Sequence, residues 1–415
     1  MNSPVSATLP LPANYDNCRI NACLRKLFSY TAKSKADTGF RISNHIAEIK
    51  KELELVNKEG TLEMSYPYLA AMEKSIPGAD FRYAVIYKKD VPVLVVCFQL
   101  FTLTSRNFNL EKNKGFVKRI FRFFLDLKKV NVLISGNALR NETACFCFND
   151  AILSRDEAVE IAASAGEKIA ADENVAALIL KDIPVSARVG KWLAAAGFQM
   201  PWEDKVMVMD VDAQWATLND YIAALSRKYK TRANKILASR SALSVRELTE
   251  QDIQHHNPEI NALFQQVTDN QSFVLTHPGS GHFPLMKKVY KDDFEVIGFF
   301  KGTELVAFYT AFITDDAYEL YYVGFDYKLN TGYQLYFNLL FSGLEGAILL
   351  KKSKLKLGRT SFDAKASMGA RPVAMDYFFK PGNITSMVSK WFANYFSDME
   401  DAKWKLRNPI ILDKG

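Results

Sequence analysis

Two patterns of apolar positions alternate along the chain: short runs rich in β-branched residues, and longer stretches in which apolar residues recur with the period of a helix. Residues 81–101 hold two apolar runs on either side of KKDVP, the pattern of a β-hairpin. The elements predicted after the hairpin are strands at 130–137 and 142–150, a helix at 155–173 capped by Ser154 or Asp156, a strand at 175–184, a helix at 186–198 and a strand at 204–211. The order reads strand, strand, strand, helix, strand, helix, strand.

The second half of the chain repeats this order. Three strands are predicted within residues 294–326, with turns at Lys301-Gly302 and Asp315-Asp316. A helix at 331–353 follows, and then strands at 354–360 and 375–381. The chain is therefore predicted to be an internal duplication of one α/β unit, not a short-period solenoid.

The boundaries follow from these patterns and from the length of 415 residues, which favours two domains. An N-terminal extension contains an amphipathic helix at 42–60, with Ser43 as candidate N-cap and Gly60 as its stop. The predicted parts are an N-terminal helical extension at 1–75, a first unit at 76–212, a basic helical linker at 213–245, a second unit at 246–385 and a tail at 386–415.

Composition narrows the class of protein. Hydrophobic residues make up 48% and charged residues 24%, which is ordinary for a folded soluble protein. The net charge of +7 favours anionic partners such as CoA-like cofactors, anionic lipid or nucleic acid. The five cysteines show no pair of CxxC motifs, so we expect reduced, buried thiols. No signal peptide and no membrane-spanning stretch is predicted, so the expected location is the cytoplasm, with peripheral contact at the inner membrane face as a further expectation.

Residues 114–129 combine large apolar side chains at helical spacing with a basic flank. This pattern is typical of an interfacial helix drawn to anionic lipid, and equally of a core helix with a solvated basic face. Two other basic clusters lie at 227–235 and 351–356. No RNA-binding pattern accompanies them, so nucleic acid is not the expected partner.

The turn after the strand YYVGF is the first candidate site. Asp326 stands at the carboxyl end of that strand, where α/β folds gather ligand-binding groups, and it could take a proton from an amine. Thr331 and Gln334 have the spacing of a capping box, so an anion could bind at the start of the following helix. The candidate cofactor-binding residues there are Lys328, Asn330, Thr331 and Gly332. An ordinary capped helix, with Asp326 capping the turn or paired with a cation, is the alternative.

A second group of polar residues follows that helix. Arg359 ends a strand that should lie beside the Asp326 strand, and Lys365 comes six residues later. Either could hold an anionic part of a substrate, or both could belong to a structural ion-pair network. His277 and His282 lie in a Gly/Pro-rich loop just before the first strand of the second unit, and such loops often border sites. Two histidines without nearby acids make a poor metal site, so no metal is expected.

Several stretches resemble the tandem branch of the GNAT acyltransferase superfamily, the FemAB-like proteins. KWLAAAGF in the first unit is similar to the end of a GNAT unit, and QWATLNDYIAALSRKYKTRANK is similar to the junction signature. VGFDYKLNTGYQLYFNLLFSGLEGAI and LGRTSFDAKASMGA are similar to the paired motifs of the second unit. The resemblance covers roughly residues 75–385. It departs at the pyrophosphate loop, where YKLNTGYQ carries only Gly332.

The resemblance implies an α/β (α+β) fold of two tandem units, each a mixed central sheet flanked by helices. It also implies an N-acyltransferase acting on an acyl thioester such as acyl-CoA, used as a co-substrate and not as a tightly bound cofactor. The acceptor would be a primary amine, and the aromatic content favours a long-chain, sphingoid-like one. Asp326, Tyr322 and His282 would be catalytic, while Arg359, Lys365 and His277 would bind substrate. The alternatives are an aminoacyl-tRNA-dependent transferase and a non-catalytic binding protein with this fold.

Overall fold

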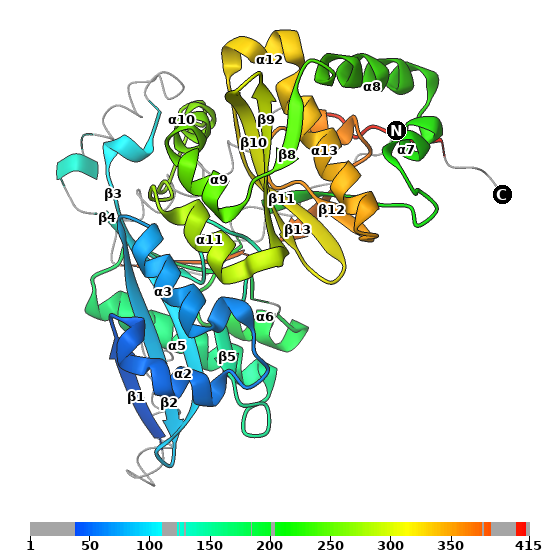
Figure 1. Cartoon of the computed structure of the whole chain (residues 1–415). Helices are drawn as coiled ribbons and strands as arrows, with labels where there is room; N and C mark the ends of the chain where they lie inside the picture. Colours follow the sequence, from blue (N-terminus) through cyan, green and yellow to red (C-terminus); the bar gives the residue numbers. More distant parts are fainter. Residues whose placement is uncertain are drawn as a thin grey trace.

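The computed structural model describes residues 38–109, 123, 125–127, 130–183, 185–200, 204–375, 377–382 and 404–411. In this part of the chain the strands form two mixed sheets of seven strands each, with helices on both faces of each sheet (Figure 1). The predicted fold class is therefore confirmed. The helix predicted at 114–129 lies almost wholly outside the described residues.

The first sheet grows from the predicted hairpin. Its turn places Lys89 and Asp90 at φ of 48° and 60°, the left-handed pair that a tight two-residue hairpin turn needs. In sheet order the strands are β1 (Thr38–Ser43), β2 (Ala79–Lys88), β3 (Val91–Leu103), β4 (Val130–Ser135), β6 (Ala177–Lys181) and β14 (Tyr377–Pro381), with β5 (Phe146–Phe148) paired to β3 beyond the end of β4.

The second sheet contains the three strands predicted from 294–326. In sheet order its strands are β13 (Arg371–Met375), β7 (Asp204–Asp210), β12 (Lys354–Lys356), β11 (Ala317–Phe325), β10 (Glu304–Ile313), β9 (Phe294–Lys301) and β8 (Ser244–Glu247). In each sheet one pair is parallel, β4 with β6 and β11 with β12, as a strand–helix–strand crossover requires.

The two halves exchange their last strands. β7 is the last strand of the first unit in the chain, yet it pairs with β12 and β13 in the second sheet. β14 comes near the end of the chain and pairs with β6 in the first sheet. The residue range 76–212 thus supplies strands to both sheets. Because each half contributes one strand to the other sheet, the two halves are held together.

Helices complete three apolar cores. Between the sheets lie α2 (Lys50–Val56), α3 (Tyr66–Ser75), α9 (Glu250–His255), α10 (Asn257–Thr268) and α11 (His282–Tyr290). The outer face of the first sheet is covered by α5 (Arg155–Asp172) and α6 (Ala187–Ala195). The outer face of the second is covered by α7 (Leu218–Ala224), α8 (Arg227–Arg240), α13 (Leu335–Leu349) and α14 (Phe362–Ala366). The central core is shared by both halves, so neither sheet is covered without the other.

Two predicted helix starts were wrong. Ser43 lies in β1, and the 3-10 turn η1 (Ile46–Ile49) that leads into α2 begins after His45. Thr331 does not cap the long helix, because α12 (Tyr327–Tyr333) already begins at Asp326, whose carboxylate accepts from Lys328 N. Gln334 then takes the left-handed conformation with φ of 51° and ends α12 before α13 begins. Asp is among the best N-cap residues, which explains the earlier start.

Short elements connect these pieces. The 3-10 turns are η2 (Leu62–Met64), η3 (Ser105–Asn107) and η4 (Lys291–Asp293). Within the described residues no helix is both long and apolar enough to cross a bilayer.

Candidate active site in the second sheet

The strands β11 and β12 pair in parallel over a short distance and then separate, and we call this point of separation the splay. Only three rungs join the strands, ending at Glu319 and Lys356, whereas β11 continues to Phe325. Beyond that rung β11 has no partner strand on the β12 side among the residues that the structure describes. A strand edge inside a folded protein offers backbone donors and acceptors that an extended ligand can use.

A β-bulge lies two residues beyond the last rung. Leu320 pairs with Ala311 and Val323 with Tyr309, so Tyr321 and Tyr322 together face the single residue Thr310. The hydroxyl of the fully buried Thr310 accepts from the Tyr322 backbone N–H at 3.0 Å. Because the bulge adds one residue, both tyrosine rings lie on the inter-sheet face, 4.9 Å apart between centroids.

Gly324 allows a helix to approach this strand closely. A Cβ atom at this position would lie 2.7 Å from the backbone nitrogen of Phe264 in α10. The glycine in YYVGFD is therefore a packing requirement, because α10 rests directly on β11 at the end of the splay.

Tyr322 belongs to a buried chain of polar side chains. Its hydroxyl lies 3.2 Å from Nε2 of His282, and Nδ1 of His282 lies 3.0 Å from the hydroxyl of Ser75. Burial lowers the pKa of His282 to about 3 and raises that of Tyr322 well above its ordinary value. At neutral pH the imidazole is thus uncharged and the phenol keeps its proton. The structure brings these two predicted residues together.

The first half of the chain contributes a loop to this site. Residues 136–145 leave the first sheet between β4 and β5 and reach β11. The Tyr322 hydroxyl donates to the Leu139 carbonyl at 3.4 Å, and the backbone N–H of Asn141 donates to the Tyr321 hydroxyl at 3.1 Å. Both bulge tyrosines are therefore held by the loop.

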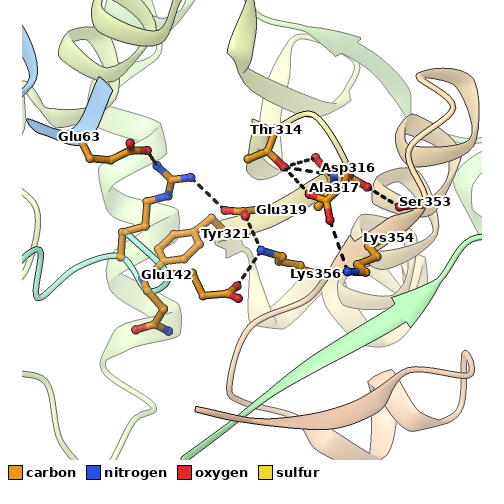
Figure 2. A network of polar contacts seen from close by, with 12 residues as sticks. Glu63, Glu142, Thr314, Asp316, Ala317, Glu319, Tyr321, Ser353, Lys354 and Lys356 are labelled. Carbon is orange, nitrogen blue, oxygen red and sulfur yellow. Dashed lines mark hydrogen bonds and ion pairs between the residues drawn. The ribbon is translucent and has the colours of Figure 1, made fainter. Parts of the chain in front are cut away.

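A buried ionic network anchors the loop at the point where the splay opens (Figure 2). Arg140, 4% exposed, pairs with Glu319 and with Glu63, each at 3.0 Å. Lys356 pairs with Glu319 and with Glu142, each at 2.9 Å. The last rung of the parallel pair thus has a charged partner from the loop on each strand. Buried charges persist only when paired in this way.

The equivalent splay in the first sheet is closed by its own lysine. The β4–β6 pairing ends at Ile134 and Ile179. The Lys181 ammonium, buried at the end of β6, donates to the carbonyls of Asn137 and Arg140 and contacts Asp182. Only the splay of the second sheet lies beside a bulge in the part of the chain that the structure describes.

The predicted turn residues lie at the far end of β11. The carboxylate of Asp326 accepts from Lys328 N at 2.7 Å and makes no ion pair with Arg359 or Lys365. Asn330 Oδ1 accepts from the Tyr336 backbone N–H at 3.0 Å, which joins α12 to α13. Lys328, Thr331 and Gly332 are exposed on α12, and the N–H groups of Lys328 and Tyr336 at the starts of α12 and α13 are already bonded to Asp326 and Asn330, so these two donors are not open to an anion.

Arg359 and Lys365 follow β12 but have separate surroundings. A guanidinium nitrogen of Arg359 lies 3.5 Å from the Tyr377 hydroxyl, which donates to Asn141 Oδ1 at 3.2 Å. Lys365 in α14 is 3% exposed, and burial lowers its pKa to about 7. In the described residues its ammonium has no hydrogen-bond or ion-pair partner. The structure therefore connects Arg359 to the loop and leaves Lys365 as an unpaired amine.

His277 lies apart from the bulge, with Nδ1 3.3 Å from the Thr268 hydroxyl. Two open cavities, of about 530 and 540 Å³, lie elsewhere. One is lined from α7, α8, β8 and α13, and the other from the start of α5 and Arg188. Neither includes Asp326, Arg359 or Lys365.

Sequence reasoning missed the loop and the network it forms. Arg140 and Asn141 gave no local signal, because their partners are far away in the chain. Glu319 and Lys181 did give one, since each stands as a single charge in an otherwise apolar strand. A charge in a buried strand implies a paired counter-charge.

No family model matches the chain, and no curated protein matches it. Among solved structures it is similar to FemX, with 8% identity, a TM-score of 0.48, and coverage of 86% of this chain and 100% of that one. It is similar to a tandem GNAT protein from the clavulanic acid biosynthesis pathway, with 9% identity, a TM-score of 0.48, and coverage of 84% and 100%. It is also similar to the C-terminal domain of a putative lysylphosphatidylglycerol synthetase from Agrobacterium fabrum, with 8% identity, a TM-score of 0.46, and coverage of 86% of this chain and 97% of that one. All three TM-scores lie below one half, and these likenesses do not establish an activity for this chain.

Proposed function

We propose that the second unit transfers an acyl group from an acyl thioester, such as acyl-CoA, to a primary amine. The observation that carries this proposal is the splay of β11 from β12 beyond Glu319 and Lys356, with the bulge at Tyr321 and Tyr322 immediately after it. An extended thioester arm can pair with the open edge of β11, and backbone N–H groups there can polarise the carbonyl.

Tyr322 is the residue that we assign to proton transfer. The neutral amine attacks the carbonyl carbon, and the C–S bond breaks as the thiolate leaves. Tyr322 donates its phenol proton to the sulfur and recovers one from the ammonium formed at the attacking nitrogen. Burial keeps the phenol protonated between turnovers, because it raises the pKa of Tyr322. His282 and Ser75 position the hydroxyl and do not touch substrate, since His282 is 1% exposed.

Asp326 has a more distant role than the sequence implied. Four residues of extended strand place it about 13 Å from Tyr322. A carboxylate at that distance acts on the amine only through ordered water. We assign Asp326 to the rim of the donor site, with Arg359, which contacts the loop through Tyr377 and Asn141, as the cation that holds an anionic part of a substrate.

The amine is proposed to be long-chain, because aromatic rings crowd the bulge. The test incubates the purified protein with a panel of acyl-CoA chain lengths and a long-chain amine, and measures released CoA. We expect release that requires both substrates, with Tyr322→Phe at least a hundredfold slower, as loss of general acid–base catalysis typically costs. Absence of release across the panel, with charged tRNA active in its place, would overturn the assignment of the donor.

A further inference from the structure

A basic and apolar patch lies on the outer side of the second sheet, away from the bulge. It consists of Arg227, Lys228 and Lys230 on α8 and of Lys405, Leu406 and Ile411 on the C-terminal segment 404–411. All six residues are exposed, and Leu406 and Ile411 have relative exposures of 56% and 59%. Two large apolar side chains this open to water, on a segment that runs beside a basic helix, are typical of a recognition surface.

Backbone contacts make the patch one surface. The segment runs beside α7 and α8, where Ser226 N donates to Pro409 O at 2.8 Å and Ile411 N donates to Ala224 O at 2.9 Å (Figure 1). Leu225 and Ile410 form a β-bridge. These contacts hold the segment at Pro409 to Ile411, and contacts of Trp404 and Arg407 hold it on both sides of Leu406, so the exposure of Leu406 and Ile411 is a property of the fold.

Side-chain contacts attach the segment on its other side. The rings of Trp404 and Phe362 stack at 5.4 Å, and Arg407 pairs with Asp363 at 3.0 Å. The nearby carboxylate of Asp363 is thereby neutralised by a residue that is not itself part of the patch.

Among the residues that the structure describes, the cations of the patch have no paired acid. Between Asp220 and Glu247 the chain has no acidic residue and seven Lys or Arg. None of the four patch cations forms an ion pair with a residue that the structure describes. The positive end of the α8 dipole lies at the same place and adds to the potential.

We propose that this patch docks the protein on an anionic lipid bilayer, with Leu406 and Ile411 entering the headgroup region and the cations contacting lipid phosphates. A nucleic acid would also meet the charge, but none of the six side chains is an aromatic platform for bases. Leu and Ile beside cations fit a lipid interface. The inference stands on residues that the proposed acyl transfer does not use.

The test is co-sedimentation of the full chain with vesicles. One set contains equal parts phosphatidylglycerol and phosphatidylcholine, and the other contains phosphatidylcholine alone, each at low and high salt. We expect binding only to the anionic vesicles, weakened by salt. The Arg227→Glu, Lys228→Glu, Lys230→Glu variant should lose roughly a hundredfold or more in partition, at about fivefold per cation. Leu406→Ser with Ile411→Ser should weaken binding while keeping its salt dependence.

The matched control reverses Lys51, Lys58 and Lys191, three exposed cations of the first half without a described ion pair, for the same change in net charge. It should bind like the wild type. Circular dichroism establishes that each variant is folded. Equal losses in control and patch variants, no binding to anionic vesicles, or tighter binding to unacylated tRNA than to vesicles would each overturn the proposal.

Discussion

Two buried side chains of the second unit, His282 and Lys365, have pKa values far below their ordinary ones. The pKa of His282 is about 3 in the folded protein, because burial disfavours the imidazolium, against about 6.5 in an unfolded chain. That of Lys365 is about 7, against about 10.4 unfolded, for the same reason. Each group lowers the free energy of unfolding as pH falls from its unfolded pKa to its folded pKa, and the loss remains at lower pH.

For His282 the sign is fixed by linkage. Between pH 6.5 and 3 the unfolded state binds one more proton, so the free energy of unfolding falls as pH falls, by up to about 1.4 kcal/mol per pH unit. His282→Gln should remove this contribution, so its deficit relative to the wild type should shrink between pH 7 and pH 5 in urea denaturation. Parallel pH profiles for the two proteins would show that His282 is not buried as an uncharged ring.

The burial of Lys365 should lower the free energy of unfolding at neutral pH. Its burial penalty is absent above pH 10.5 and grows as pH falls to 7, because the unfolded amine is protonated over that range. Lys365→Met should therefore raise the free energy of unfolding at pH 7, on the order of 2–4 kcal/mol. A destabilised Met variant would mean that the ammonium has a partner in solution.

At the scale of elements, local signals predicted local structure. The β2–β3 hairpin, the Ser154 cap of α5 and the turns of the second sheet were all readable, because each is set by a few neighbouring residues. The break between α12 and α13 was not, since Gln334 adopts a conformation usually reserved for glycine or asparagine. The positions of β7 and β14 in the sheets could not be predicted from the sequence either, because strand pairing depends on partners far away in the chain.

Because Asp326 caps α12, two substitutions at this position can distinguish a structural role from a catalytic one. Asparagine caps as well as aspartate, whereas alanine loses about 1 kcal/mol. Amide exchange of residues 327–333 should therefore be unchanged in Asp326→Asn and faster in Asp326→Ala. If Asp326 also acts in catalysis, both variants should lose activity. Full activity in the Asn variant would leave Asp326 with its capping role alone.

At the scale of the whole molecule, the strand exchange and the Arg140 network make the two halves one cooperative body. Removing Arg140 leaves the carboxylates of Glu63 and Glu319 buried without their partner. Arg140→Met should cost about 3–5 kcal/mol in chemical denaturation, and Glu319→Gln in the same chain should recover part of that loss. A cost below about 1 kcal/mol would mean that the loop is not held by this network.

Calorimetry tests the same point without a mutation. Because β7 and β14 each belong to the sheet of the other half, both halves should unfold in a single transition. Two resolved transitions would show that the sheets are stable separately, and the loop would then be a peripheral contact.

The most direct measurement is a crystal structure with a hydrolysis-resistant acyl-CoA thioether. We predict that the acyl arm lies along β11 beyond Glu319 and Lys356, with its carbonyl within hydrogen-bonding distance of a backbone N–H near Tyr321 and Tyr322. An acyl arm bound at the first sheet, or anywhere other than this open edge, would contradict it.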